Sequence, residues 1–304
     1  MTGTRRTDHA ITWSLRALAC GSVAVAIAPK ASATADSAVA ALWSLIFSCS
    51  FAHNCMFEGI VAIASFAVWI WVYNILDSTS LAPRYRFDRA SPQRLRDGHS
   101  NRGVLEATVY LLSIAAWHVF VRTRPPLEES APTFSRLLYE TLSGLIAYDL
   151  LFFPIHLALH HFAWVRSTHG DHHATGGALR ASETTHHSLV DGMLQVAVNV
   201  VVQQRAWHPW SGRWGRKHDL SRLLHNVAVT YMLTECHSGY DAPWCMHRVA
   251  PAVLGGGLRH REHHHHGTVC FAQFSLYLDW LCGTSPSAAL TKGAVCRSRA
   301  SQSR

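Results

Sequence analysis

Three histidine-rich stretches decide the fold, and they read HLALH at residues 156–160, HGDHH at 169–173 and HREHH at 260–264. Only four of the 22 histidines precede residue 156, and the other eighteen lie between His156 and His266. Chance explains this clustering poorly. The pattern therefore predicts that the three stretches build one shared site.

The spacing within each stretch suits metal binding. In HLALH the two histidines are four residues apart, which places both rings on one face of a helix. Each HxxHH stretch adds an adjacent pair whose nitrogens diverge enough to reach two metals. The three stretches together supply eight imidazoles.

Imidazole suits iron, zinc and copper, whereas magnesium and calcium prefer oxygen ligands. Eight nitrogens exceed what one ion takes, and at about four to six ligands per ion they indicate two metals with open positions for oxygen. Water-soluble di-iron bundles use Glu and Glu-x-x-His ligands instead. The boxes of this chain pair histidine with histidine instead, so that fold is disfavoured.

Isolated histidines are more often satisfied polar or interfacial residues than metal ligands. We assign this role to His53, His99, His118, His208 and His218. In the run from His263 to His266, the first two complete the HxxHH spacing. We expect His265 and His266 to be bystanders or partners of metal-bound imidazoles.

The composition favours a membrane protein, because 49% of residues are apolar and only 15% are charged, against about a quarter charged in soluble domains. Four apolar segments approach the length of a bilayer crossing, and they are Ala38–Ala52, Ile60–Ile75, Val104–Val121 and Leu137–Ile155. We predict an all-α integral membrane helical bundle with a cytosolic histidine-rich catalytic cap.

Two shorter apolar runs, Leu189–Val202 and Leu223–Leu233, flank a basic, tryptophan-rich loop and predict a hairpin. A hairpin returns the chain to its starting side, so His187 and His237 should lie on the face that carries His156. A full crossing would put the basic loop opposite the arginines at 84–102, against the positive-inside rule. A shallow hairpin would avoid this conflict, and both forms remain open.

The net charge of +8 fits anionic lipid headgroups better than nucleic acid, because the arginines sit beside apolar segments. The arginines at 84–102 favour the cytoplasmic side for that stretch. The eight cysteines are scattered without a CxxC pair, which predicts free thiols.

Three arginines precede an apolar run at Ala17–Ala28, a pattern that fits a cleaved signal, a signal anchor or an organelle leader. We favour an anchor or leader. The expected organisation is an N-terminal leader or anchor with hydrophobic helices over 1–103, a catalytic domain over 104–284, and a disordered basic tail over 285–304.

The histidine boxes, in this order, resemble those of the fatty acid hydroxylase/sterol desaturase superfamily. The resemblance covers about residues 104–284 and includes Asp149, seven residues before His156, and the nine-residue step from His160 to His169. The strings HSGYDAPW at 237–244 and YLDWLCGT at 277–284 are similar to its sterol-oxidising branch of cholesterol 25-hydroxylases and C-4 methylsterol oxidases.

The resemblance implies an iron-dependent monooxygenase that uses two iron ions and O2 to hydroxylate a lipid, either a sterol or a fatty acyl chain. It also implies a separate cytochrome b5-type or similar electron donor and residence in the endoplasmic reticulum. His237 becomes a ninth ligand candidate. The expected metal ligands are His156, His160, His169, His172, His173, His237, His260, His263 and His264.

Three other functions fit the sequence less well. A desaturase of the same superfamily begins from the same carbon radical, and the string at 237–244 favours hydroxylation over it. A membrane metal transporter should carry its histidines within spanning helices rather than beyond their ends. A zinc hydrolase needs an HExxH motif, which the chain lacks. Asp149 and Asp191 could accept hydrogen bonds from ligand N–H groups, although Asp149 could instead serve local helix contacts.

Overall fold

The computed structural model describes residues 2–27, 29–87, 100–120, 124–174 and 179–286. The helices in chain order are α1 (Thr2–Ile27), α2 (Pro29–Ser48), η1 (Ser50–His53), α3 (Phe57–Asp77), α4 (Ala82–Tyr85), α5 (Ser100–Phe120), α6 (Phe134–His161), α7 (Ala163–Gly170), η3 (Ala181–Thr185), α8 (Leu189–Gln204), α9 (Asp219–His237), α10 (Met246–Val249), α11 (Gly256–His266) and α12 (Tyr277–Leu281). Strands β1 (Arg205–His208) and β2 (Arg213–Arg216) form one short antiparallel pair between α8 and α9.

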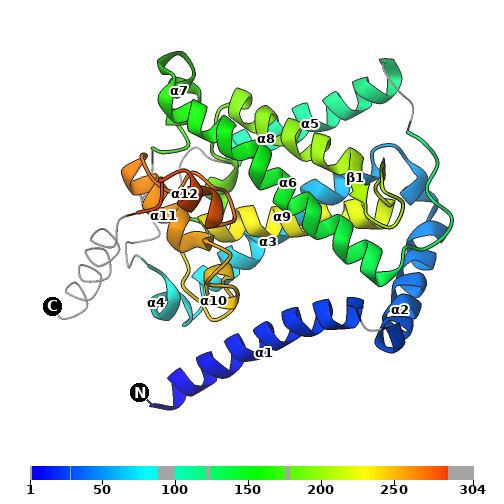
Figure 1. Cartoon of the computed structure of the whole chain (residues 1–304). Helices are drawn as coiled ribbons and strands as arrows, with labels where there is room; N and C mark the ends of the chain where they lie inside the picture. The colour runs from blue at the N-terminus through cyan, green and yellow to red at the C-terminus, as the bar shows by residue number, and fades with distance from the viewer. Residues whose placement is uncertain (1, 28, 88–99, 121–123, 175–178, 287–304) are drawn as a thin grey trace.

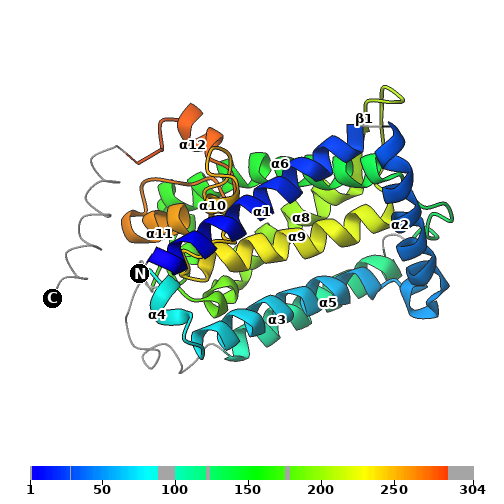
Figure 2. The same ribbon diagram turned by 90° about the horizontal axis from the view of Figure 1, so that it is seen from below.

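The long helices α3, α5, α6, α8 and α9 form a bundle and extend from one end of it toward the other (Figures 1 and 2). Helix α9 packs on both α3 and α6, and α8 packs on α5 and α6. The main apolar core lies between α6, α8 and α9, where Phe152, Val198 and Met232 are buried. The short elements α7, α11 and α12 gather at one end of this bundle (Figure 1).

Three helical stretches are long and apolar enough to cross a bilayer, namely Phe57–Asp77, Gly103–Phe120 and Phe134–His161. Large apolar side chains such as Trp71, Leu112 and Ile146 are exposed on them. Lipid would cover such side chains. The predicted all-α membrane bundle with a histidine-rich cap is confirmed, and the protein is an integral membrane protein.

The fourth predicted crossing, Ala38–Ala52, coincides with a helix only as far as Ser48. Helix α2 ends at Ser48, and its apolar part, Ala33–Ser48, is shorter than the other three. The chain then turns through η1, where the Asn54 N–H donates to the Phe51 carbonyl. Trp43 on α2 is buried against His218, so this helix packs on one end of the bundle.

The predicted hairpin is present and extends along α6. Near its base, Asp191 on α8 contacts His169 close to the end of α6. At its tip, the His218 N–H donates to Glu140 near the start of α6 (2.8 Å). The hairpin therefore packs along α6, and His187 and His237 return toward the end that carries His156.

Helix α1 lies against the bundle rather than apart from it. Its Asp8 accepts from Arg84 and from the Tyr85 hydroxyl, both at 2.6 Å. Arg16 donates to the Arg248 carbonyl (2.7 Å), beside α10. The structure does not test the predicted leader or anchor, nor the domain boundaries. Residues 287–304, most of the predicted tail, lie outside the described residues.

Candidate metal centre

Four elements carry the predicted ligands to one end of the bundle. The last turns of α6 hold His156 and His160, and α7 with the turn after it holds the second box. The end of α9 supplies His237, and α11 supplies the third box. The nine nitrogens form two groups, a five-nitrogen group of His156, His160, His169, His173 and His263, and a four-nitrogen group of His172, His237, His260 and His264.

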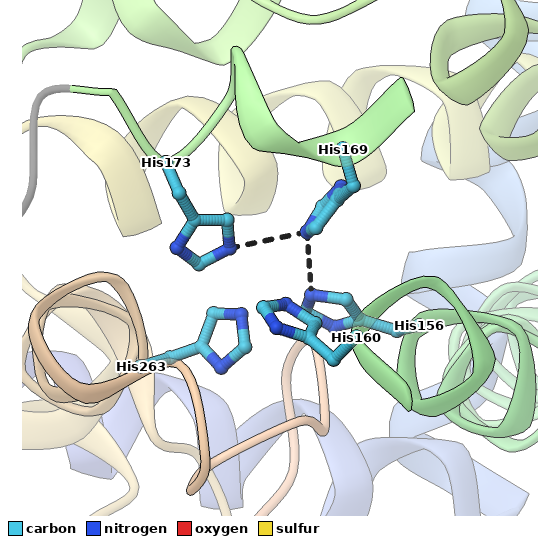
Figure 3. A group of neighbouring side chains, drawn as sticks. All are labelled: His156, His160, His169, His173 and His263. Carbon is cyan, nitrogen blue, oxygen red and sulfur yellow. Dashed lines mark hydrogen bonds between the residues drawn. The ribbon is translucent and has the colours of Figure 1, made fainter. Parts of the chain in front are cut away.

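The five-nitrogen group joins all three histidine boxes (Figure 3). Its ligand atoms lie within 4.8 Å of one another. The Nε2 atom of His169 lies 3.2 Å from Nε2 of His156 and 3.1 Å from Nε2 of His173. The two members of HLALH face the group together, as the four-residue spacing predicts.

The four-nitrogen group is buried throughout. Nε2 of His237 lies 3.2 Å from that of His172 and 2.8 Å from that of His260, while His264 approaches His260 at 3.1 Å. The two groups adjoin, because the rings of His173 and His264 stack with centroids 4.4 Å apart. The adjacent histidines of each HxxHH box thus reach different groups, as expected.

Outer partners turn the ligand rings toward the groups. The Nδ1–H of His156 donates to the Phe271 carbonyl, and that of His263 donates to the Val269 carbonyl, both at 2.8 Å. Three more ligands donate their Nδ1–H in the same way. His169 donates to Asp191 Oδ2 (2.7 Å), His172 to the His186 carbonyl (3.2 Å) and His237 to the Leu233 carbonyl (2.8 Å). Each bond places the proton on Nδ1 and leaves Nε2 free to bind metal.

This tautomer assignment gives a test of whether a metal fits. His156 and His169 both carry their proton on Nδ1, so their unprotonated Nε2 atoms face each other at 3.2 Å. Two lone pairs repel at that distance unless a cation lies between them. In addition, Nε2 of His160 and of His263 is buried and has no hydrogen-bond partner in the part of the chain that the structure describes. The donor set therefore fits a metal ion.

The imidazoles of the four-nitrogen group are held neutral. Burial, reinforced by the neighbouring imidazoles, lowers the pKa of His172, His260 and His264 well below the usual value. Burial lowers the pKa of His237 to about 4. Neutral imidazole is the form that binds metals, so the folded chain presents ready ligands at neutral pH.

Asp191 and Asp149 have different roles. Asp191 accepts from the ligand His169, as expected. Asp149 instead accepts three backbone N–H groups, from Gln273 (2.8 Å), Phe274 (3.2 Å) and Ser275 (2.8 Å). Asp149 therefore holds a loop and not a ring, and the expectation that it accepts from a ligand N–H group is wrong.

Asp279 on α12 completes this loop clamp, a feature that the sequence reasoning missed. Its carboxylate accepts from the N–H groups of Phe271 (2.8 Å) and Ala272 (3.1 Å). Five consecutive backbone N–H groups, from 271 to 275, are thus bound by two buried carboxylates. The clamp positions the Phe271 carbonyl that orients His156.

The histidines predicted to be bystanders lie outside both groups. His265 and His266 are exposed on α11. His208 lies beside Glu140, and His218 caps α9 at the other end of the bundle. His53 and His118 belong to neither group, and His99 lies outside the described residues. His187 pairs with Glu106 instead of joining a group (3.0 Å).

A small cavity of about 10 Å³ adjoins both groups. This volume is close to what one water-sized molecule needs. Besides five of the histidines, three residues from α6, α8 and the clamped loop line it, and they are Phe152, Gln195 and Gln273. Neither glutamine was predicted, because a single amide in an apolar stretch carries no spacing signal.

Comparison with known proteins shows to which family the chain belongs. A model of the fatty acid hydroxylase family matches residues 141–284. The cholesterol 25-hydroxylase-like protein 2 of Danio rerio is 30% identical over 255 residues, which cover 78% of this chain and 84% of that protein. The chain belongs to the fatty acid hydroxylase family.

Two further relatives of this family member are shorter matches. The cholesterol 25-hydroxylase of Mus musculus is 30% identical over 201 residues, which cover 64% of this chain and 63% of the relative. A predicted methylsterol monooxygenase of Dictyostelium discoideum is 30% identical over 178 residues, covering 58% and 61%. No solved structure matches the chain significantly.

Family membership confirms two predictions. The chain is a membrane-bound lipid hydroxylase, and therefore an oxidoreductase, and it belongs to the superfamily that its histidine boxes resemble. It does not favour the desaturase, transporter or hydrolase alternatives. The family and the histidine groups together support an iron-dependent oxygenase.

Proposed function

We propose that the chain is a di-iron monooxygenase that hydroxylates a sterol, with its two iron ions held by the five-nitrogen and four-nitrogen groups. The facing Nε2 lone pairs of His156 and His169 carry this proposal, because a shared cation removes their repulsion. His172 and His237 repeat the arrangement in the other group, since both carry their proton on Nδ1 and their Nε2 atoms are 3.2 Å apart.

The number and type of ligands support two transition-metal ions. Five and four nitrogens match the usual coordination of one ion each and leave positions for O2. Iron is favoured over zinc because hydroxylation of an unactivated C–H bond needs redox chemistry, which bound iron supplies by activating O2. The protein supplies orientation, through acceptors such as Asp191, and a buried setting that excludes water.

The sterol substrate rests on the relatives, which carry the names of cholesterol 25-hydroxylases and a methylsterol monooxygenase. A sterol would approach from the bilayer, and the cavity has an apolar wall from Phe152 on the membrane-crossing helix α6. A fatty acyl chain is the other lipid class that the family supports.

The electrons would come from a separate protein, and we propose a cytochrome b5-type donor. Neither a fused cytochrome b5 nor a flavin motif is recognisable in the sequence. We also propose residence in the endoplasmic reticulum.

The proposal is tested by lipid profiling of cells that express the wild type, His172→Ala, His264→Ala or His265→Ala. His172 and His264 belong to the four-nitrogen group. The control residue His265 follows His264 on α11 but is exposed. We expect an oxygenated sterol in the wild type and in His265→Ala, and none in the other two variants.

Metal analysis of the purified proteins separates loss of iron from loss of folding. We expect close to two iron ions per wild-type chain and a reduced content in His172→Ala and His264→Ala, with similar expression in all four samples. Bound zinc without iron, or the same lipids in all four samples, would overturn the proposal.

A further inference from the structure

A second cavity, of about 350 Å³, lies beside α12 at the end of the bundle that holds the histidines. The described residues that line it include none of the nine candidate ligands, so it is separate from the metal centre. Its volume falls within the range of about 300–1,000 Å³ that is usual for small-molecule sites. Its wall is mainly apolar, and the few charged and aromatic side chains in it indicate which ligand fits.

The position of α12 along α6 places this cavity at the depth of lipid headgroups. Helix α6 has 28 residues, which at 1.5 Å per residue make about 42 Å, the thickness of a bilayer with both headgroup layers. Leu278 on α12 shares an apolar cluster with Phe153 of α6, and Leu157 packs against that cluster. These two residues of α6 lie about 6 to 12 Å from its end, near the boundary between hydrocarbon and headgroups.

The exposed side chains of α12 suit this depth. Trp280 is 74% exposed and Leu281 is 67% exposed, whereas the neighbouring Leu278 is buried. Tryptophan is enriched at the membrane interface, because its ring is apolar and its N–H is polar. Since Trp280 also lines the cavity, lipid headgroups at this level can reach it.

Arg259 on α11 brings a positive charge to the cavity wall. Arg248 on α10 pairs with Asp241, but Arg259 forms no ion pair with any carboxylate in the part of the chain that the structure describes. Its guanidinium contacts the Cys270 thiol, which is only a weak acceptor. The other donors of the guanidinium are available to a phosphate group.

Asp279 on α12 brings a negative charge to the same wall. Its carboxylate accepts from two backbone N–H groups and from the Thr284 hydroxyl, and none of these donors carries a charge. Burial raises the pKa of this carboxyl, but the three hydrogen bonds favour its ionised form. Tyr277 and Trp280, three residues apart on one face of α12, also line the cavity. Aromatic rings of this kind bind quaternary ammonium groups.

We propose that this cavity binds the headgroup of phosphatidylcholine, with the phosphate on Arg259 and the choline group against Tyr277 and Trp280. One positive and one negative charge in the wall match a zwitterionic headgroup. A headgroup with a net negative charge would leave Asp279 without a cation. The compact ammonium of phosphatidylethanolamine is more strongly hydrated, so aromatic rings favour choline. The acyl chains would extend past Leu281 into the hydrocarbon layer.

The first test measures which lipid stays bound to the wild type. The full chain, purified with iron, is placed in nanodiscs that contain equal amounts of phosphatidylcholine and phosphatidylglycerol with identical acyl chains. Native mass spectrometry after transfer to detergent counts the lipids that remain. We expect one retained phosphatidylcholine, and equal retention of both lipids or a preference for phosphatidylglycerol would overturn the inference.

Two variants locate the site. We expect Arg259→Gln and Trp280→Ala each to lower the affinity for phosphatidylcholine about 10-fold, because each loses a contact to one charge of the headgroup. The matched controls are Arg213→Gln and Trp164→Ala, whose side chains are exposed outside the cavity. Equal retention in Trp280→Ala and Trp164→Ala would refute the site, and this comparison holds even where Arg259→Gln fails to fold.

A last measurement distinguishes a lipid headgroup from a free anion. In lipid-free detergent, a short-chain phosphatidylcholine should raise the temperature of thermal unfolding, whereas inorganic phosphate or choline chloride alone should not. A shift with inorganic phosphate as large as the shift with the lipid would show an anion site only and would overturn the inference. None of these measurements requires turnover, so their outcome is independent of the proposed hydroxylation.

Discussion

The two ends of helix α6 both bury histidines, yet they bury them differently. At the metal end, imidazole nitrogens face one another. At the other end, Glu140, His208, Lys217 and His218 form what we call the far-end cluster, in which a carboxylate lies beside basic side chains. Glu140 accepts from Arg136 Nε (2.9 Å) and from the His218 N–H (2.8 Å), and His208 Nε2 lies 3.0 Å away.

The contrast shows that burial alone does not mark a metal ligand. His218 is as deeply buried as His263. However, His218 has a partner for each nitrogen, because Nδ1 accepts from the Leu220 N–H and Nε2 contacts the Ser130 carbonyl. Among the described residues, His263 has a hydrogen-bond partner for Nδ1 and none for Nε2. An unsatisfied nitrogen that faces others of its kind is the distinguishing feature.

The largest effect should follow from removing a ligand at the metal end. We expect His160→Ala to lower product formation at least about 100-fold, since ligand loss should exceed the 10- to 100-fold cost of losing an outer partner. The iron content should fall with it. His208→Asn in the far-end cluster is the matched control and should keep its iron, and equal iron loss in both variants would erase the distinction between the ends.

A smaller loss should follow when a partner of a ligand changes. Asp191→Asn keeps an oxygen beside His169 Nδ1 but removes the charge, and we expect activity to drop about 10- to 100-fold. Product formation per bound iron measures this effect. Asp191→Glu, which retains the charge, should recover part of the activity, and unchanged activity in Asp191→Asn would contradict the assigned role.

At the far end the expected effect is on stability and not on chemistry. Glu140→Gln removes the charge that Arg136 and His208 face, and we expect the free energy of unfolding to fall by about 1–3 kcal/mol. Thermal unfolding in detergent measures the change. Activity per bound iron should stay within about two-fold of the wild type, and a larger loss would show that the two ends are coupled.

The two ends should also respond to pH in separate ranges once metal is removed with a chelator. The pKa of His237 is about 4 in the folded chain and about 6.5 when unfolded. Only the unfolded chain then takes up a proton as the pH falls from about 6.5 to 4, so stability should drop by at most about 1.4 kcal/mol per pH unit for this group.

Lys217 in the far-end cluster should affect stability in the alkaline range instead. Burial lowers its pKa to about 8, against about 10.4 for a free lysine, and its Nζ has no hydrogen-bond partner among the described residues. Stability from this group should therefore rise as the pH increases from about 8 to 10.4. Unfolding free energies measured from pH 4 to 10 check both ranges, and Lys217→Met should abolish only the upper one. Stability that grows as the pH falls from 7 to 5 would contradict the assignment at the metal end.

The sequence predicted which histidines come together because ligand spacing is local. The four-residue step of HLALH and the HxxHH pattern each correspond to one turn of helix, and the structure brings all nine candidate residues together. The separation into groups of five and four could not be predicted, because it depends on how α7 and α11 lie against α6. His237 was found only through the family resemblance, since an isolated histidine carries no spacing signal.

The far-end cluster and the loop clamp depend on contacts between distant segments. Glu140 and Lys217 are far apart in the sequence, and so are Asp149 and the loop at 271–275 that it binds. Asp149 was noticed for its distance from His156, yet its position on α6 directs it to the loop. The end of α2 was predicted too late for a different reason, because the apolar run in the sequence continues past Ser48, where the helix ends.

The loop clamp has a consequence for biogenesis. The carbonyl that orients His156 belongs to Phe271, whose own N–H is bound by Asp279, and Asp279 is bound in turn by the Thr284 hydroxyl (2.6 Å). A nascent chain that has been synthesised only as far as its last histidine, His266, still lacks Asp279, whose carboxylate holds Phe271 in place. The segment through Thr284 must therefore be synthesised before the Phe271 carbonyl is held in the position that orients His156.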